Sequence, residues 1–84
     1  MEIKIGDWFT IKRPQTLMLD KTYRFMKVHM RERGQWAMKC FTNSKVDWMT
    51  YKEENLLYSI EKEIIVPSSP SEILEATVLE SKLK

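Results

Sequence analysis

The chain contains one histidine, His29, and one cysteine, Cys40, and these two side chains would have to supply any cysteine–histidine nucleophilic chemistry. Such catalysis requires the imidazole to lie within hydrogen-bond reach of the thiol. The strand pairing predicted below places His29 on the charged face of a hairpin and Cys40 on its apolar face. Because the two side chains then point in opposite directions, we expect a surface histidine and a buried, inactive thiol.

Other catalytic and cofactor chemistry has little support in the residue pattern. One histidine and one cysteine cannot complete a zinc site within a chain. The two glycines, Gly6 and Gly34, are too far apart to form a glycine-rich phosphate loop. The acidic residues at 53–54 and at 61 and 63 fall in turn and strand-end contexts, which favours solvated carboxylates over an acid–base pair. We therefore expect a non-enzymatic protein without a metal or cofactor.

Binding has better support, because aromatic residues and cations share the predicted outward face of a sheet. Aromatics and arginine commonly anchor protein partners, and aromatics interleaved with cations also stack bases and hold phosphates. We expect a protein partner, with nucleic-acid binding as the alternative. In a third interpretation, the aromatics pack beneath the C-terminal tail and the lysines pair with its glutamates. The candidate partner-binding residues of this face are Phe25, Lys27, Arg31, Lys39, Phe41 and Trp48.

A second candidate contact lies in the loop at residues 15–21, where Leu17, Met18 and Leu19 form an unusually apolar run. Large exposed apolar patches usually mark a partner surface. Leu17 and Met18 are therefore candidate partner-binding residues as well. The simpler alternative is that this loop folds back over one end of the core.

The element that would position most of these side chains is a β-hairpin from Tyr23 to Phe41. A three-residue turn at Glu32-Arg33-Gly34, with Gly34 in the left-handed region, sets its register. One face then pairs Met30 with Trp36, Val28 with Met38 and Met26 with Cys40, while the other pairs Arg31 with Gln35, His29 with Ala37, Lys27 with Lys39 and Phe25 with Phe41. An apolar face opposite a mostly charged face indicates a half-buried sheet. The like-charged lysine pair is unfavourable unless an acidic group lies near it.

The next predicted strand, Val46 to Tyr51, has two alternative registers. A two-residue Asn43-Ser44 loop would place Met49 and Tyr51 in the core and leave Val46 and Trp48 on the outward face. A three-residue loop would reverse this assignment, because a slip of one residue turns every side chain to the other face. We favour the two-residue loop.

Short strands are also predicted at residues 3–5, 8–12 and 56–60, with a single helical turn at 52–55. In the tail, Ser69-Pro70-Ser71-Glu72 has the pattern of a helix capping box. The helix that follows, to about Leu83, has no clear apolar stripe, so it should dock loosely, fray, or become ordered on a partner. The expected organisation is a barrel at 1–62, a linker at 63–70 and a C-terminal helix or partly disordered tail at 71–84.

Composition supports a single small globular domain. The 84 residues are 43% hydrophobic and 31% charged. The single cysteine excludes an internal disulfide and fits a reducing cytosol, and the sequence contains no apolar run of membrane-spanning length or signal-peptide type. Residues 1–52 carry eleven Lys and Arg against five acidic residues, whereas residues 53–84 carry three Lys against seven Glu. A basic body with an acidic tail indicates either an acidic partner or complementarity between the two parts. We expect a cytoplasmic monomer or weak homo-oligomer.

The order of these segments resembles an SH3-like small antiparallel β-barrel of five to six short strands with a C-terminal helical tail. The resemblance rests on Gly6-Asp7 before the first strand, the loop after it, the hairpin, and Tyr51-Lys52-Glu53-Glu54-Asn55-Leu56 as a helical turn before the last strand. The acidic loop residues and Trp-Trp step of peptide-binding SH3 domains are absent. In size and composition the chain also resembles small bacteriophage-encoded proteins that bind host machinery. That resemblance implies a phage- or prophage-type modulator or adaptor acting on a host protein.

Overall fold

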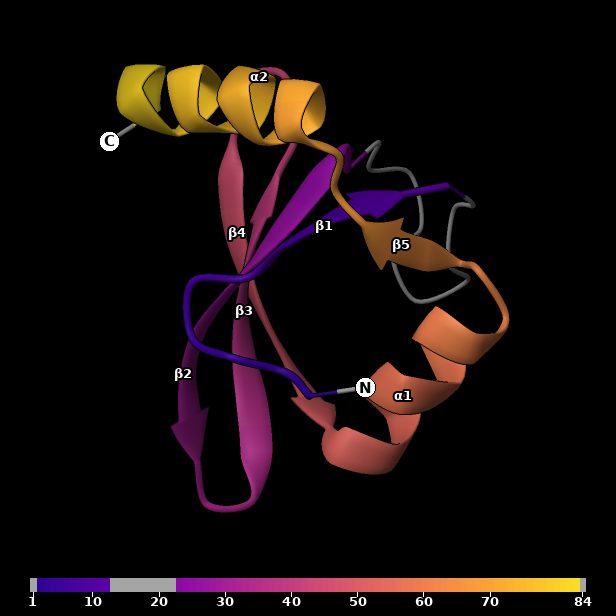
Figure 1. Ribbon diagram of the computed structural model, residues 1–84. Helices are drawn as coiled ribbons and strands as arrows, with labels where there is room; N and C mark the ends of the chain where they lie inside the picture. Colours follow the sequence, from indigo (N-terminus) through magenta and orange to yellow (C-terminus); the bar gives the residue numbers. More distant parts are fainter. Residues whose placement is uncertain (1, 13–22, 84) are drawn as a thin grey trace.

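The computed structural model describes residues 2–12 and 23–83. Within them, five strands form one antiparallel sheet in the order β4-β3-β2-β1-β5, with two helices (Figure 1). The elements are β1 (Trp8–Ile11), β2 (Phe25–Glu32), β3 (Gln35–Phe41), β4 (Val46–Lys52), α1 (Glu53–Glu61), β5 (Ile65–Pro67) and α2 (Pro70–Lys82).

The predicted hairpin is β2–β3, and the half that lies away from the turn has the expected register. Phe25 pairs with Phe41, and the confirmed pairing continues through Met26–Cys40, Lys27–Lys39 and Val28–Met38. A β-bulge then interrupts the ladder between Val28 and Met30. Because the bulge adds one residue, His29, to β2, the pairing at the tip moves by one position.

The tip of the hairpin therefore differs from the prediction. Met30 pairs with Ala37 and Arg31 with Trp36, so the predicted pairs Met30–Trp36, His29–Ala37 and Arg31–Gln35 are wrong. The turn has two residues, Arg33 and Gly34, and both have positive φ, at 50° and 76°. Two-residue loops with this geometry match the twist of the flanking strands.

The favoured register of β4 is confirmed. The backbone N–H of Thr42 donates to the carbonyl of Lys45 across the two-residue loop, at 2.9 Å. Met49 pairs with Met38 and Tyr51 with Trp36. Val46 and Trp48 consequently lie on the opposite face from the inner core.

Two of the predicted short strands are wrong, and a strand forms where a linker was expected. Residues 3–5 form no strand, and residues 56–60 belong to α1 instead of a closing strand. Leu56 and Ser59, three residues apart, are the buried residues of α1, which is the spacing of one helix face. The strand that completes the sheet is β5, which lies in the expected linker and pairs with β1.

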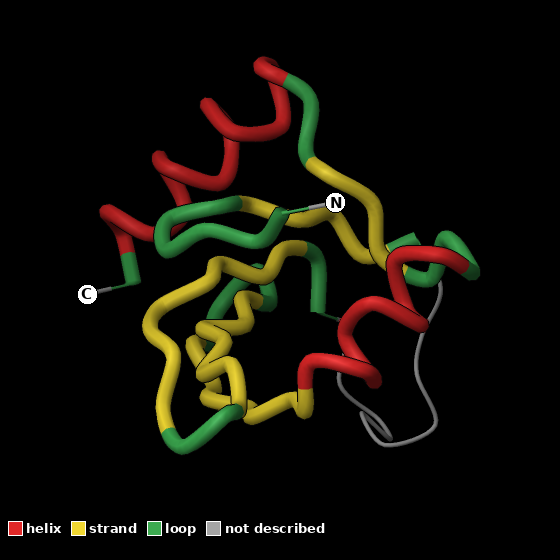
Figure 2. The backbone as a smooth tube through the Cα atoms, turned by 60° about the horizontal axis from the view of Figure 1, so that its bottom comes forward, coloured by secondary structure: helices red, strands yellow, loops and turns green. Residues whose placement is uncertain are grey.

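The fold is mainly β with a C-terminal helix, as expected, but the expected closed barrel is not formed, because the sheet is open. β4 and β5 are its two edges and do not pair with each other. The helices lie well apart, with α1 following β4 and α2 lying across the ends of the central strands (Figures 1 and 2). Neither helix of the described ranges is long and apolar enough to span a membrane.

Apolar side chains form two clusters, one on each face of the sheet. The inner cluster lies on the side of α1 and contains Phe9, Tyr23, Met26, Val28, Trp36, Met38, Cys40, Tyr51, Leu56 and Ile65. The outer cluster lies beneath α2 and contains the buried residues Phe25, Phe41 and Ala76, with Trp8, Val46, Leu79 and Leu83 partly buried around them. The face expected to meet a partner therefore carries a second core.

Candidate interaction surface

The outer face of the sheet carries a row of four side chains across four adjacent strands. Trp8 on β1 pairs with Lys27 on β2, Lys27 with Lys39 on β3, and Lys39 with Trp48 on β4. The Lys27 Nζ lies 5.2 Å from the centroid of the Trp8 ring, and the Lys39 Nζ lies 5.9 Å from that of Trp48. Cations at this distance from an indole are within range of a cation–π attraction. We call these four residues the Trp–Lys–Lys–Trp row.

Helix α2 covers one end of this face, and its start is as predicted. The Ser69 hydroxyl accepts a hydrogen bond from the Glu72 backbone N–H at 3.3 Å, and the Ser69 backbone N–H donates to the Glu72 carboxylate at 2.8 Å. Pro70 occupies the first turn, where its missing N–H has no consequence. This capping box fixes where the helix begins after β5.

The expectation that Phe25 and Phe41 are exposed is wrong. They are 2% and 0% exposed, because Ala76 of α2 packs against them and is itself fully buried. The small alanine side chain lets the helix approach the two rings closely. For these two rings, the arrangement found is the third interpretation of the sequence, in which the tail covers the aromatics; Trp48 is left uncovered and is 57% exposed.

Glu80 of α2 lies between the two lysines of the row. Its carboxylate oxygens are 3.1 Å from the Lys27 Nζ and 3.4 Å from the Lys39 Nζ. Burial alone would raise the pKa of Glu80, but hydrogen bonds and charge from Lys27 and Lys39 outweigh it, so its pKa lies below the ordinary value. Glu80 is thus the acidic group that the opposed lysine pair requires.

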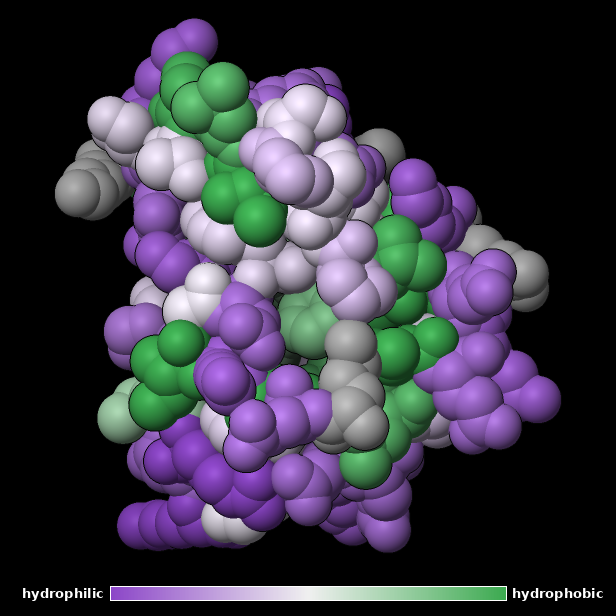
Figure 3. Space-filling model, in the orientation of Figure 1, coloured by the Kyte–Doolittle hydropathy of each residue, from purple (hydrophilic) through white to green (hydrophobic). Residues whose placement is uncertain are grey.

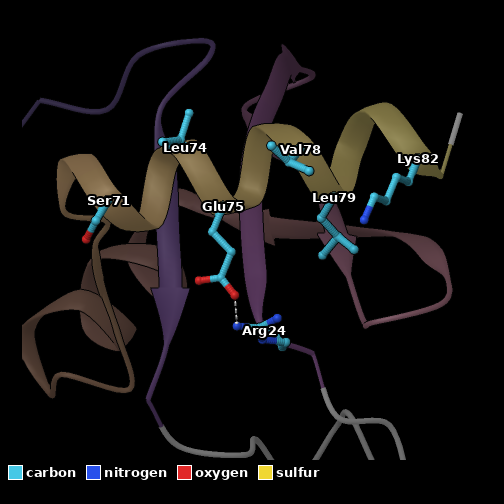
Figure 4. A pocket seen from close by; sticks show the side chains of 7 residues that line it. All are labelled: Arg24, Ser71, Leu74, Glu75, Val78, Leu79 and Lys82. Carbon is cyan, nitrogen blue, oxygen red and sulfur yellow. Dashed lines mark hydrogen bonds and ion pairs between the residues drawn. The ribbon is translucent and has the colours of Figure 1, made fainter.

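Two further glutamates of α2 contact cations of the body. Arg24 forms an ion pair with Glu75, which points toward it from the helix (Figure 4), and Lys12 lies 3.8 Å from Glu72. The other side of the helix is apolar and open: Leu74 is 68% exposed and Val78 48%. Apolar side chains gather over α2 at the top of Figure 3.

Arg31 lies away from the outward face on which we expected it. Because of the bulge, it pairs with Trp36, whose side chain belongs to the inner cluster. The Arg31 guanidinium lies 4.8 Å from the Trp36 ring centroid and 2.8 Å from the Glu53 carboxylate. Its hydrogen bond and charge lower the pKa of Glu53. Arg31 therefore links the tip of the β2–β3 hairpin to the start of α1.

The uncovered end of the outer face centres on Trp48, which is 57% exposed. The His29 ring meets it nearly edge-on, with the centroids 4.7 Å apart and the planes at 72°. Met30, the next residue of the bulge, is 42% exposed. We call His29, Met30 and Trp48 the Trp48 patch.

His29 and Met30 were missed as members of this patch by the sequence prediction. The prediction already placed His29 on the outward face, although not among the candidate residues. The bulge moves Met30 from the predicted apolar face to the outward face, where it pairs with the small Ala37. No residue type in the stretch marks a bulge, so the pattern gave no signal for it. The candidate residues Leu17 and Met18 lie outside the described residues.

Cys40 and His29 lie on opposite faces, as expected. Cys40 is fully buried in the inner cluster, whereas His29 lies in the Trp48 patch. Burial, with a smaller contribution from the charge of Asp47, raises the pKa of the Cys40 thiol to about 12. The thiol is therefore protonated at neutral pH. Across residues 2–12 and 23–83, no group of three or more His, Cys, Asp or Glu side chains could hold a metal ion.

No protein-family model, curated protein or solved structure matches this chain. The functional interpretation therefore rests on the geometry of the surface itself.

Proposed function

We propose that this protein is a non-enzymatic binding module that contacts another protein through the Trp48 patch. The observation that carries the proposal is the exposure of Trp48 on a regular strand. Burying a large indole stabilises a fold, so an indole that stays exposed to water does not contribute this stabilisation. Trp and Met are enriched at the centres of protein interfaces.

The contact with His29 supports a role in recognition. It holds the Trp48 ring in one orientation, so less side-chain entropy is lost when a partner binds. The positions of the lysines favour a protein over nucleic acid. Lys27 and Lys39, which would have to hold phosphates, already share Glu80, so a phosphate would have to displace that carboxylate.

The narrower form of the proposal is an SH3-like module of phage or prophage type that modulates a host protein in the host cytoplasm as a monomer or weak homo-oligomer. The strand order β4-β3-β2-β1-β5, with a helix between β4 and β5, supports the SH3-like part. The phage-type part rests on size and composition alone.

The test is affinity capture from a bacterial lysate, with and without nuclease, comparing the wild type with Trp48→Ala and Tyr58→Ala. Tyr58 is a matched control, because it is 56% exposed and lies on α1, away from the patch. Loss of an aromatic anchor typically costs about 2 kcal/mol or more, which is roughly a 30-fold loss of affinity.

We expect one protein to be retained by the wild type and Tyr58→Ala after nuclease treatment, and to be lost with Trp48→Ala. Retention by Trp48→Ala would refute the role of the patch. Enrichment that disappears with nuclease would replace the proposal with nucleic-acid binding.

A further inference from the structure

We propose that the part of the outer face beneath α2 is a recognition site for an acidic amphipathic helix, and that α2 is its displaceable intramolecular occupant. We call this part the α2 platform: Trp8, Phe25, Lys27, Lys39 and Phe41. A partner that carries an acidic helix of the same pattern would replace α2 there. The inference concerns a different surface from the Trp48 patch and does not depend on the proposed function.

Helix α2 buries little of its own surface on the platform. Ala76 is its only buried residue. Leu79 and Leu83 add partly buried apolar contacts. The remaining contacts are three glutamates that meet cations of the body, with Glu72 on Lys12, Glu75 on Arg24 and Glu80 between the platform lysines. Contacts of this kind are partly exposed and weaken with salt. They are therefore compatible with an α2 that dissociates from the platform.

The platform itself combines cations with aromatic rings. The Lys39 Nζ lies 5.5 Å from the Phe41 ring centroid, and the Lys27 Nζ lies 5.2 Å from that of Trp8. The two lysines also oppose each other on neighbouring strands, which is unfavourable without an anion between them. The uncovered platform would therefore present aromatic rings beside a pair of uncompensated cations.

Helix α2 defines the pattern that fits this platform. A small residue, Ala76, lies over the two phenylalanines, an apolar residue follows at Leu79, and a carboxylate follows at Glu80. The spacings of three and four residues place all of them on neighbouring turns of one helix. A partner helix that repeats the small–apolar–acidic pattern can make the same contacts, which is a helix-in-groove mode of recognition.

Tethering determines how the site responds to such a partner. α2 follows β5 directly, and the Ser68 backbone N–H donates to the Trp8 carbonyl at 3.0 Å, so the helix starts beside its platform. A short tether gives an effective concentration in the millimolar range. A free helix therefore has to compete with α2, and weakening α2 in the full chain must increase the affinity for a free helix.

The experiment uses the full-length protein and a fluorescent synthetic peptide of residues 68–84 as the probe, read by anisotropy. The test variant is Glu75→Gln/Glu80→Gln. The control variant is Glu54→Gln/Glu61→Gln, which makes the same change of net charge on α1. We expect the peptide to bind the test variant at least about 10-fold more tightly than the wild type or the control. A peptide carrying Glu80→Gln is expected to bind the test variant at least about 10-fold more weakly than the unmodified peptide.

Equal affinity of the peptide for test and control variants, or no binding to either, would overturn the proposal. If the test variant binds a single-stranded oligonucleotide more tightly than it binds the peptide, the acidic-helix assignment is overturned. A dimer that exchanges α2 between copies would also overturn it.

Native-state hydrogen exchange gives an independent check on the wild type. The amides of α2 should exchange at least about 10-fold faster than those of β3; equal protection would show that α2 does not open separately. Met30→Ala changes the Trp48 patch at a residue that pairs with Ala37 and not with a platform residue. It should leave peptide binding within about twofold, which separates this inference from the proposed function.

Discussion

Replacing Glu80 by glutamine tests whether the charges of the platform lysines hold α2 in place. Glutamine keeps the size of the side chain but removes its charge from between Lys27 and Lys39. The magnitude follows from exposure, since an exposed ion pair contributes about 0–1 kcal/mol. The Glu80 side chain is only 15% exposed and serves two lysines that are 31% and 22% exposed. Each pair should therefore lie toward the upper end of that range.

The lost pairs and the uncompensated repulsion between the lysines together give an expected loss of about 1.5 kcal/mol in the free energy of unfolding. For a domain of this size, that corresponds to a fall in Tm of roughly 6–12 °C. The assay is urea unfolding with a thermal melt as a second readout, and Glu75→Gln is the control. Because the side chains of Glu75 and its partner Arg24 are 53% and 39% exposed, the control should lose less than about 0.5 kcal/mol. Equal losses in both variants, or none in Glu80→Gln, would refute the reasoning.

Three further predictions concern ionisable groups. The pKa of Glu80 is lowered in the folded state, so its stabilising contribution is present above the unfolded pKa of 4.5 and is lost as the pH falls through the lower folded pKa. The urea midpoint of the wild type should therefore decrease between about pH 5 and pH 3. The decrease should be smaller in Glu80→Gln. The Cys40 thiol, with a pKa of about 12, should react with a thiol reagent at pH 8 roughly 100-fold or more slowly in the native state than in urea; equal rates would contradict its burial. Burial, together with a hydrogen bond from the Tyr23 hydroxyl to the Asp47 carboxylate at 2.6 Å, raises the pKa of Tyr23 to about 12. Because Tyr23→Phe removes this hydrogen bond, it should lower the free energy of unfolding in urea by about 1–2 kcal/mol. An unchanged urea midpoint would show that the bond is not stabilising.

The central pairing of the sheet could be predicted because alternation is a strong signal where one face is buried. A slip of one residue between Met26 and Cys40 would have moved every apolar side chain to the wrong face. Nothing comparable constrained the tip of the hairpin. There, Met30 could lie on either face, and the two-residue turn at Arg33 and Gly34 with the bulge at His29 was as compatible with the residue types as a three-residue turn.

The segment after β4 was misassigned for a different reason. Leu56 to Ile60 is a short apolar run, which periodicity alone does not distinguish between helix and strand. Once it is helical, the chain needs another strand beside β1. Ile65 to Pro67 fills that place, although its neighbouring prolines and serines resemble a linker.

Part of the face that was expected to be exposed is covered, and the reason lies in α2. Its contact residue is Ala76, which is too small to reveal an apolar stripe, so the covered face of Phe25 and Phe41 was expected to be open. The signal that could have found the cover was electrostatic. The unfavourable pair Lys27–Lys39 required an acidic group, and seven of the twelve acidic residues of the chain lie in residues 53–84.

The most direct test is an NMR measurement on the wild-type protein that shows which side chains of the outer face are covered by α2 and which are exposed. The account predicts nuclear Overhauser effects from the Ala76 methyl to the rings of Phe25 and Phe41, together with strong broadening of the Trp48 indole signal by a soluble paramagnetic agent and weaker broadening for Trp8 and Trp36. Absence of the Ala76 contacts, with Phe25 and Phe41 as accessible to the agent as Trp48, would contradict it.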